Sequence, residues 1–223
     1  MPPIDDPLVA ADRAALLETL MRGVIHDFRN ALQTLVMVES VRAAEGAVPE
    51  HLQVLQADAV ARLTRLLTTL DRIFTGDGDP GPVALPDVVG FVRDVEPFQR
   101  RLPTVTLVAD LAPGLPAVRA PRAALEHALL RMLTTAKGNL GGRSGAVVRV
   151  TARAAGPVVE LGVEHGPAPA LDPGELEAAG TLAVLRRLAA GWEGRVWAEV
   201  GPTGGRVVVA VPAWGGKPPW SGP

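Results

Sequence analysis

The chain has 223 residues, which is long enough for one large domain or for two small ones with separate hydrophobic cores. Hydrophobic residues make up 48% of the sequence and charged residues 21%, a composition typical of a globular rather than a disordered protein. The net charge of -2 gives no indication of a nucleic-acid-binding surface. Because there is no cysteine, disulfides, thiolate metal sites and cysteine nucleophiles are excluded.

Membrane and metal binding are also disfavoured by the sequence. No apolar run approaches the roughly 18 residues that a membrane span requires, and no basic segment followed by an apolar one begins the chain. We therefore expect a cytoplasmic protein without membrane contact. The four histidines have no spacing typical of a zinc site, and we expect the chain itself to bind no metal or cofactor.

Two amphipathic helices are predicted at the N-terminus, over about 10–45 and 49–74, with the glycine and proline of 45–49 as the break between them. Each helix has one apolar stripe, and two such helices bury too little surface to be stable alone. The sequence therefore predicts a helical hairpin domain over 8–75 that associates as a homodimer, giving a four-helix bundle.

A histidine lies on the polar side of the first predicted helix. At ~100° per residue, His26 is about 200° from the apolar Val24 and should be exposed to solvent. The residues predicted to share its face are Arg22, Arg29, Asn30 and Gln33. Several of these side chains are hydrogen-bond donors, which suit a bound anion.

The segment around this histidine has the residue types that a phosphoryl carrier needs. An unperturbed imidazole is largely neutral at pH 7 and can act as a nucleophile. Asp27 could hold one ring nitrogen in its protonated form while the other attacks, and Asn30, one turn later, could orient a reactant. Taken alone, however, the segment fits a solvated surface histidine better than a functional site.

A second domain follows a predicted linker at 75–82, which is dense in glycine, proline and aspartate. Strands and helices then alternate, which predicts an α+β fold over 83–213 with helices packed on one face of a sheet, and a flexible tail over 214–223. The predicted helices are 85–101, 121–140 and 175–191, and the predicted strands are 104–109, 146–154, 158–164, 195–200 and 206–211.

Together these features resemble the sensor histidine kinases. His26-Asp27-Phe28-Arg29-Asn30 resembles the phosphoacceptor box on the first helix of their dimeric hairpin. The second half of the chain is similar to their α/β ATP-binding domain, and the likeness extends over about residues 15–212. Its matching segments are 125–140 for the helix of the metal-binding asparagine, 158–168 for the strand and nucleotide loop, and 180–200 for the last helix and strand.

The departures from that family lie in the nucleotide site. The resemblance assigns Arg131 and Thr135 to the two asparagine positions, Glu164 to the aspartate that recognises adenine, and Ala168 to a loop glycine. Leu182 stands where a glycine would wrap phosphates, and only 11 residues separate Ala168 from Gly180, too few for the usual lid. These changes imply that ATP binding has been lost.

A helical phosphoacceptor joined to a degenerate kinase-like domain resembles the bacterial histidine phosphotransferases of phosphorelays. The resemblance implies that His26 exchanges a phosphoryl group with aspartates of response-regulator receiver domains, and that the receiver brings the Mg²⁺. It assigns catalysis to His26, Asp27 and Asn30, and partner binding to Arg22, Arg29 and Gln33. Two alternatives remain: an ATP-dependent histidine kinase with an atypical site, and a non-catalytic pseudokinase scaffold.

Three other features have simpler interpretations. His127 and His165 are expected to be surface histidines or partly buried ones with satisfied ring nitrogens. Glu160 and Glu164 share one face of a strand, where packing or solvation is expected rather than catalysis. The glycine-rich segment 138–145 lacks the lysine of a phosphate-binding loop and is interpreted as a turn before a strand.

Overall fold

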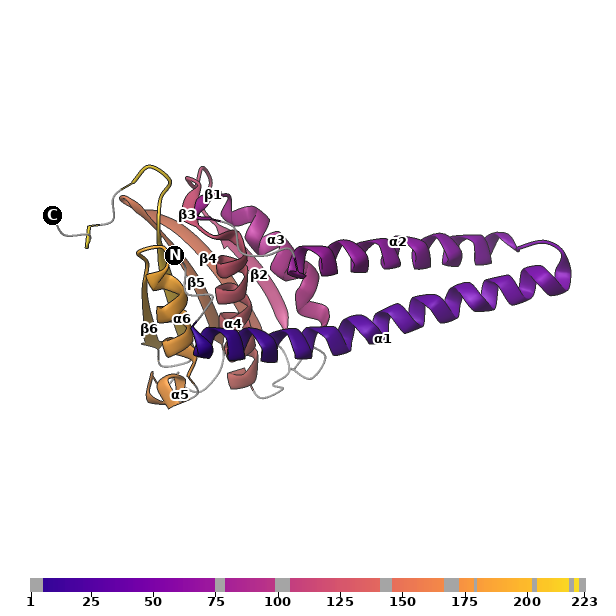
Figure 1. The fold of residues 1–223 in the computed structure, drawn as a ribbon, viewed down its shortest axis with the longest axis horizontal. Coiled ribbons are helices and arrows are strands. Elements are labelled where there is room, and N and C mark those ends of the chain that lie inside the picture. The colour runs from indigo at the N-terminus through magenta and orange to yellow at the C-terminus, as the bar shows by residue number, and fades with distance from the viewer. Residues whose placement is uncertain are drawn as a thin grey trace.

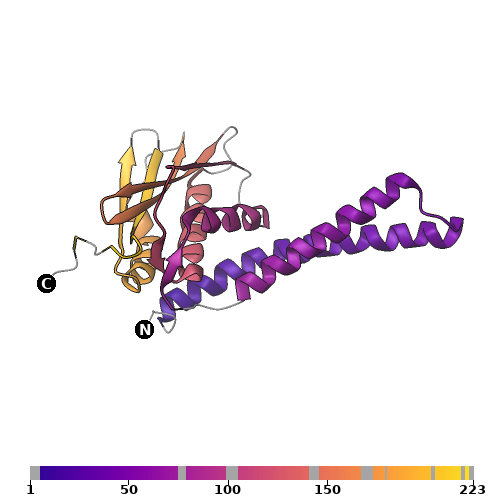
Figure 2. The same ribbon diagram turned by 90° about the horizontal axis from the view of Figure 1, so that it is seen from above.

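A computed structural model describes residues 6–74, 79–98, 105–140, 146–166, 173–178, 180–201, 204–216 and 219–220. A long helical hairpin projects from one side of an α/β domain (Figure 1), and the beginning of its first helix lies against the helices of that domain (Figure 2). Within these ranges no helix is long and apolar enough to cross a membrane.

The hairpin consists of α1 (Pro7–Glu45) and α2 (Glu50–Phe74). Helix α1 begins three residues earlier than the apolar pattern predicts, because the Asp6 carboxylate accepts hydrogen bonds from the first backbone N–H groups and Pro7 suits the first helical turn. The helix ends at Gly46, which adopts a left-handed φ of 75° and donates its N–H to the Arg42 carbonyl. The predicted break between the two helices is confirmed.

The second domain is a five-stranded sheet with helices on one face, which confirms the predicted α+β class (Figure 2). The strands have the order β2-β4-β5-β7-β6, with β2 parallel to β4 and the other neighbours antiparallel. Their bounds are β2 Thr106–Leu111, β4 Val147–Ala155, β5 Val158–Gly166, β6 Arg195–Gly201 and β7 Gly204–Pro212. The covering helices are α3 Leu85–Val95, α4 Arg122–Leu140 and α6 Thr181–Ala190.

Several predicted boundaries were wrong. The end of the expected linker is strand β1 (Gly81–Val83), which pairs with a second unpredicted strand, β3 (Val118–Ala120). The helix predicted over 175–191 is two helices, α5 (Pro173–Ala178) and α6, because Gly180 has a φ of 72° that no continuous helix allows. The helix predicted over 85–101 stops at Val95 and is followed by one 3₁₀ turn, η2 (Glu96–Phe98), with 99–101 outside the described residues.

Two other predictions concern chain segments that are only partly described. Within the segment 138–145, which was interpreted as a turn, α4 continues to Leu140, and 141–145 lie outside the described residues. The segment 214–223 was expected to be a flexible tail, but its described residues contact the second domain. The Trp214 N–H donates to the Ala117 carbonyl at 2.7 Å, and Trp220 donates its indole N–H to the Glu193 carbonyl at 2.8 Å.

Helix α1 belongs to both domains. It has 39 residues and α2 has 25, so roughly its first four turns extend past α2. On this extension Val9, Leu16 and Leu20 are buried and belong to the same core cluster as the apolar side chains of α3 and α4. The beginning of α1, which is predicted to belong to the hairpin domain over 8–75, therefore also contributes to the core of the second domain.

A close backbone contact fixes the point where the hairpin leaves the second domain. A Cβ atom built on Gly23 of α1 would lie 2.2 Å from the Phe98 carbonyl oxygen and 2.7 Å from the Phe98 Cα. Only glycine therefore allows η2 to pack directly on the helix backbone. The buried Lys137 ammonium of α4 pairs with the Glu96 carboxylate and gives η2 a second attachment.

We predict that Gly23→Ala lowers the free energy of unfolding by about 1–3 kcal/mol, because the added methyl group meets backbone atoms that cannot rotate away. Gly138→Ala is the matched control, since Gly138 is an exposed helical glycine of α4 and a Cβ added there would have no atom within 4 Å. The control should gain up to about 1 kcal/mol from helix propensity. Urea unfolding measures both, and equal gains would contradict the close contact.

Candidate functional site

His26 is an exposed residue in the middle of α1, as the helical pattern predicts. Its side chain is 52% exposed, although it lies three residues after Gly23, where η2 packs on the helix. Within the described part of the chain, the only polar contacts of the imidazole are made by Nδ1. The Nε2 atom is therefore free to meet a reactant that approaches from solvent.

Two side chains of α1 compete for Nδ1. The Asp27 Oδ1 atom lies 3.3 Å from it and the Asn30 amide nitrogen lies 3.1 Å from it. A protonated Nδ1 donates to the Asp27 carboxylate and leaves the lone pair on Nε2, whereas a bare Nδ1 accepts from the Asn30 amide and places the proton on Nε2. Asp27 therefore favours the tautomer in which Nε2 is nucleophilic, and Asn30 favours the other.

Asp27 is itself held by a residue that the sequence analysis missed. Its side chain is only 6% exposed and points toward α2, where the Arg62 Nη2 donates to Asp27 Oδ2 at 2.6 Å. This ion pair leaves Oδ1 directed at the imidazole, so Arg62 positions the carboxylate that positions His26. The sequence does contain a signal for this ion pair. Asp27 falls near the buried side of the helical wheel, and a buried carboxylate requires a cationic partner.

The three residues expected to bind a partner surround the histidine without contacting its ring. Arg22, Arg29 and Gln33 are exposed. Arg22 pairs with Glu18 on the preceding turn of α1. In the described structure none of the three has a hydrogen bond or ion pair to His26, so their expected role depends on a molecule outside this chain.

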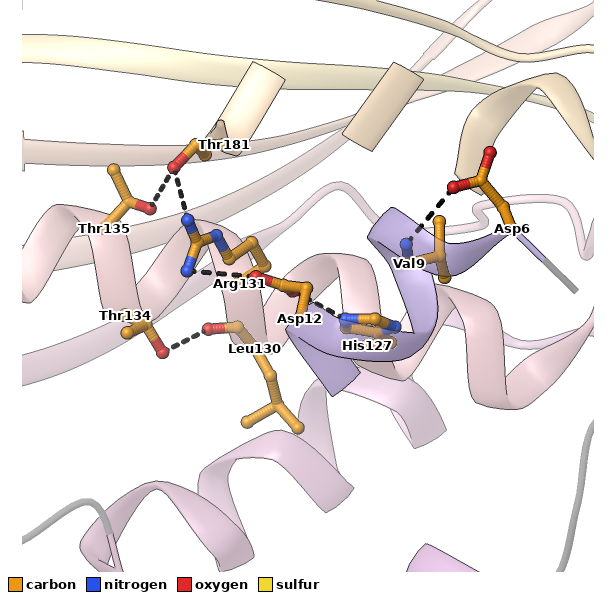
Figure 3. Close-up of polar contacts among 9 residues, drawn as sticks. All are labelled: Asp6, Val9, Asp12, His127, Leu130, Arg131, Thr134, Thr135 and Thr181. Atoms are coloured by element: carbon orange, nitrogen blue, oxygen red, sulfur yellow. Dashed lines mark hydrogen bonds and ion pairs between the residues drawn. The ribbon is translucent and has the colours of Figure 1, made fainter. Parts of the chain in front are cut away.

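A second polar cluster joins the beginning of α1 to α4 and α6 (Figure 3). The Asp12 carboxylate accepts from Arg131 Nη1 at 3.1 Å and lies 2.8 Å from His127 Nε2, and its side chain is 8% exposed. Arg131 also donates to the Thr181 hydroxyl at 3.1 Å, which lies 3.2 Å from the Thr135 hydroxyl. His127 is thus a buried histidine with a hydrogen-bonded ring nitrogen, which is one of the two states expected for it.

This cluster contains two positions that the family resemblance assigns to asparagines, of which that of Thr135 is the metal-binding one. Arg131 and Thr135 are instead hydrogen-bonded to the first residue of α6, and the negative charge beside Arg131 comes from Asp12. Asp6 adds a contact at the beginning of α1, where its carboxylate lies 3.5 Å from Arg187 of α6. The described residues contain no group of three His, Asp or Glu side chains that could hold a metal ion.

Glu164, which the resemblance aligns with the adenine-recognising aspartate, lies away from the other aligned residues, in the solvated strand position that the sequence predicts for it. Side chains alternate along β5, and Val163 is buried beneath the helices while Glu164 faces the opposite side of the sheet. There its Oε1 lies 3.4 Å from Nε of Arg206. Since Arg131 and Thr135 lie on the helix-covered side, Glu164 cannot converge with them. Ala168 lies outside the described residues, and Leu182 is buried in the core.

His165 occupies the inward position next to Glu164. It is buried, and neither ring nitrogen has a hydrogen-bond partner in the described structure. Burial away from water lowers the pKa of His165, since the charged imidazolium would lose its hydration there. The sequence expectation of satisfied nitrogens is therefore wrong for His165, and a neutral, core-filling imidazole fits its surroundings.

Comparisons with solved structures identify the architecture. The catalytic domain of histidine kinase ThkA matches with a TM-score of 0.52 and 16% identity, over 61% of this chain and 98% of that domain. The mycobacterial sensor histidine kinase MprB matches with a TM-score of 0.50 and 18% identity, over 60% of this chain and 97% of that chain. The second domain thus has the fold of a histidine-kinase catalytic domain.

A further match includes the hairpin. The structure of histidine kinase ThkA in complex with response regulator protein TrrA matches over 95% of this chain and 65% of that chain, with 17% identity and a TM-score of 0.50. No protein-family model matches the sequence, and the comparison with curated proteins finds no match. At these identities the likeness defines the fold of the chain.

We predict that Arg62→Ala lowers the free energy of unfolding by about 1–2 kcal/mol, because it leaves the buried Asp27 carboxylate without its cation. This loss of free energy is at the lower end of the range for such ion pairs, because the Arg62 side chain is 47% exposed. Arg22→Ala, which breaks an exposed pair within α1, is the control and should cost less than about 0.5 kcal/mol. Urea unfolding that gives equal losses would contradict a structural role for Arg62.

Proposed function

We propose that this protein is a histidine phosphotransferase of a two-component phosphorelay, in which His26 passes a phosphoryl group between aspartates of response-regulator receiver domains. The observation that supports this most is the geometry of the imidazole, because the Asp27 carboxylate lies 3.3 Å from Nδ1 and favours the tautomer with the lone pair on Nε2, and the ring is open to solvent. The fold shared with histidine kinases supports the same assignment. The receiver would bring the Mg²⁺ that offsets the phosphoryl charge.

The transfer needs little covalent chemistry from the chain. The Nε2 lone pair forms a bond to phosphorus as the bond from phosphorus to the receiver's aspartyl oxygen breaks, and the carboxylate leaves with the electron pair. Nδ1 keeps its proton, and the positive charge that develops on the ring is balanced by Asp27. The second transfer is the reverse reaction toward another aspartate. In-line placement and charge balance supply most of the acceleration.

The second polar cluster, which joins the beginning of α1 to α4 and α6 (Figure 3), supports a phosphoryl source other than ATP. In the histidine-kinase resemblance, Thr135 stands at the position of the metal-binding asparagine and Arg131 at an earlier asparagine position. Here both are engaged by Thr181, and Arg131 is neutralised by Asp12 from α1. A nucleotide with its metal would have to displace these contacts and find ligands among an arginine and a threonine, which suit a divalent cation poorly. This argues against the alternative of an ATP-dependent kinase.

The exposed apolar face of the hairpin supports the proposed homodimer. On α1 the exposed Ile25 and Leu32 and the half-buried Phe28 and Leu35 form one stripe, about 100° or more around the helix from His26. On α2 the exposed Val60 and Leu67 continue an equivalent stripe. A second copy of the hairpin would cover both stripes in a four-helix bundle and leave His26 accessible.

For the transfer itself, we predict that His26→Gln abolishes phosphoryl flow between two receiver domains and that Asp27→Asn slows it about a hundredfold, because the amide no longer holds the nucleophilic tautomer. Asp58→Asn, at an exposed carboxylate of α2, is the control and should transfer at the wild-type rate. Labelled phosphate followed from donor to acceptor receiver provides the measurement. Undiminished flow through His26→Gln would contradict the assignment of His26 as the phosphoryl carrier, and no flow through the wild-type chain would favour the alternative of a non-catalytic scaffold.

For the assembly, we predict that the wild-type chain is a dimer at micromolar concentration and that Leu67→Glu converts it to a monomer, since a carboxylate would be buried in the bundle. Val54→Glu is the matched control, because Val54 is exposed on α2 but lies roughly 220° around the helix from Leu67. Light scattering after size-exclusion chromatography reports the mass. A monomeric wild-type chain would contradict the bundle.

A further inference from the structure

The Asp27 carboxylate is shared between the two helices of the hairpin. Its side chain is 6% exposed, and Oδ2 accepts a hydrogen bond from Arg62 Nη2 of α2 at 2.6 Å. Oδ1 lies 3.3 Å from Nδ1 of His26 on α1. The guanidinium and the imidazole therefore use different oxygens of Asp27, and the shorter contact is the one with the guanidinium.

A carboxylate next to a nucleophilic histidine has two opposing effects. It holds the proton on Nδ1 and leaves the lone pair on Nε2, which favours attack on phosphorus. It also stabilises the imidazolium, in which both ring nitrogens carry a proton and neither can attack. At about 4 Å near a protein surface, an unbalanced negative charge raises the proton affinity of an imidazole roughly tenfold, or about one pH unit.

The ion pair with Arg62 separates these two effects. A guanidinium is always charged in proteins, so the Asp27–Arg62 pair has no net charge. Oδ1 remains an acceptor for Nδ1, but the positive charge beside the carboxylate reduces its attraction for an imidazolium. The carboxylate can therefore orient the ring of His26 while the ring stays neutral.

This arrangement depends on the packing of α2 on α1. Arg62 and Asp27 are 35 positions apart in the chain and meet only in the assembled hairpin. Four side chains one turn before and after the two residues are buried, namely Val24 and Ala31 of α1 and Ala59 and Leu66 of α2. The register of the two helices is thus fixed around the ion pair, and an isolated α1 would lack the balancing charge.

We propose that Arg62 is a positioning residue for phosphoryl transfer, which acts through Asp27 to keep His26 neutral with its proton on Nδ1. The proposal rests on the phosphotransferase function proposed above and extends its site from α1 to α2. The second helix of the hairpin thereby sets the pH range over which the histidine of the first helix can accept a phosphoryl group.

An NMR titration of the His26 ring in the full-length chain tests this role without any partner protein. In Arg62→Gln, which removes the cation, we expect the midpoint of the titration to rise by about 0.5–1 pH unit. Arg62→Lys keeps the charge and should recover about half of that shift or more. Arg65→Gln is the matched control and should leave the midpoint unchanged, because Arg65 is exposed on the same helix and has no ion pair in the described part of the chain.

The pH dependence of transfer gives a second readout. Because an added proton blocks Nε2, Arg62→Gln should accept phosphate from a receiver domain roughly threefold more slowly than the wild type at pH 7, and at the wild-type rate at pH 9. A loss that is only structural would lower the rate by the same factor at both pH values.

The outcomes separate this proposal from the proposed function. An unchanged midpoint in Arg62→Gln overturns the role of Arg62, whether or not the chain transfers phosphate. If the midpoint rises but the wild type transfers no phosphate, the proposed function fails and the control of the His26 proton by Arg62 stands. If the wild type transfers phosphate and Arg62→Gln loses the same factor of rate at pH 7 and pH 9, the function stands and the role of Arg62 in transfer is overturned.

A second pair of variants applies if Arg62→Gln is too unstable to titrate. Asp27→Asn removes the carboxylate and leaves the guanidinium unbalanced, whereas Asp27→Asn/Arg62→Gln removes both charges. The midpoint of the His26 titration should be lower in the first than in the second, because a nearby cation disfavours the imidazolium. Equal midpoints overturn the role of Arg62.

Discussion

The sharing of α1 between two cores determines where the rest of the structure lies. The first turns of α1 contribute apolar side chains to the core of the second domain, and Asp12 anchors them to Arg131 and His127. The later turns of the same helix form the hairpin with α2. Because a continuous helix is stiff, the second domain cannot move relative to His26 unless the Asp12 contacts break or α1 bends. The contact between Gly23 and Phe98 adds a second point of attachment one turn before the histidine.

These contacts with α1 give the second domain a structural role that does not require a bound nucleotide. A domain that phosphorylates a histidine on its own hairpin has to bring a bound nucleotide to that histidine, which requires movement. Here the domain is tied to α1 by buried ionic contacts between Asp12, Arg131 and His127. The contacts that engage Arg131 and Thr135 internally therefore also fix the second domain relative to the hairpin.

Much of the fold could be predicted from local patterns. The 3.6-residue spacing of apolar side chains located α1, α2 and α4, and the helical wheel placed His26 in solvent. Contacts between distant segments could not be predicted in this way. Arg62 and Asp27 are 35 positions apart, and Asp12 and His127 are 115 apart, so each pair depends on a packing register that one sequence does not reveal. Strand β1 was missed because Gly81 and Pro82 are usually turn residues, and its pairing with β3 overrides that preference.

The central claim is that His26 receives phosphate from an acyl phosphate on another protein and carries it on Nε2. Phosphorus NMR of the full-length chain tests it directly, because the two phosphorylated ring nitrogens give distinct resonances. With a receiver domain charged by a small acyl-phosphate donor, the account predicts one signal, from phosphate on Nε2 of His26, that is lost in His26→Gln. With Mg²⁺ and ATP alone it predicts no signal. A phosphohistidine resonance that forms from ATP in the absence of any receiver would contradict it.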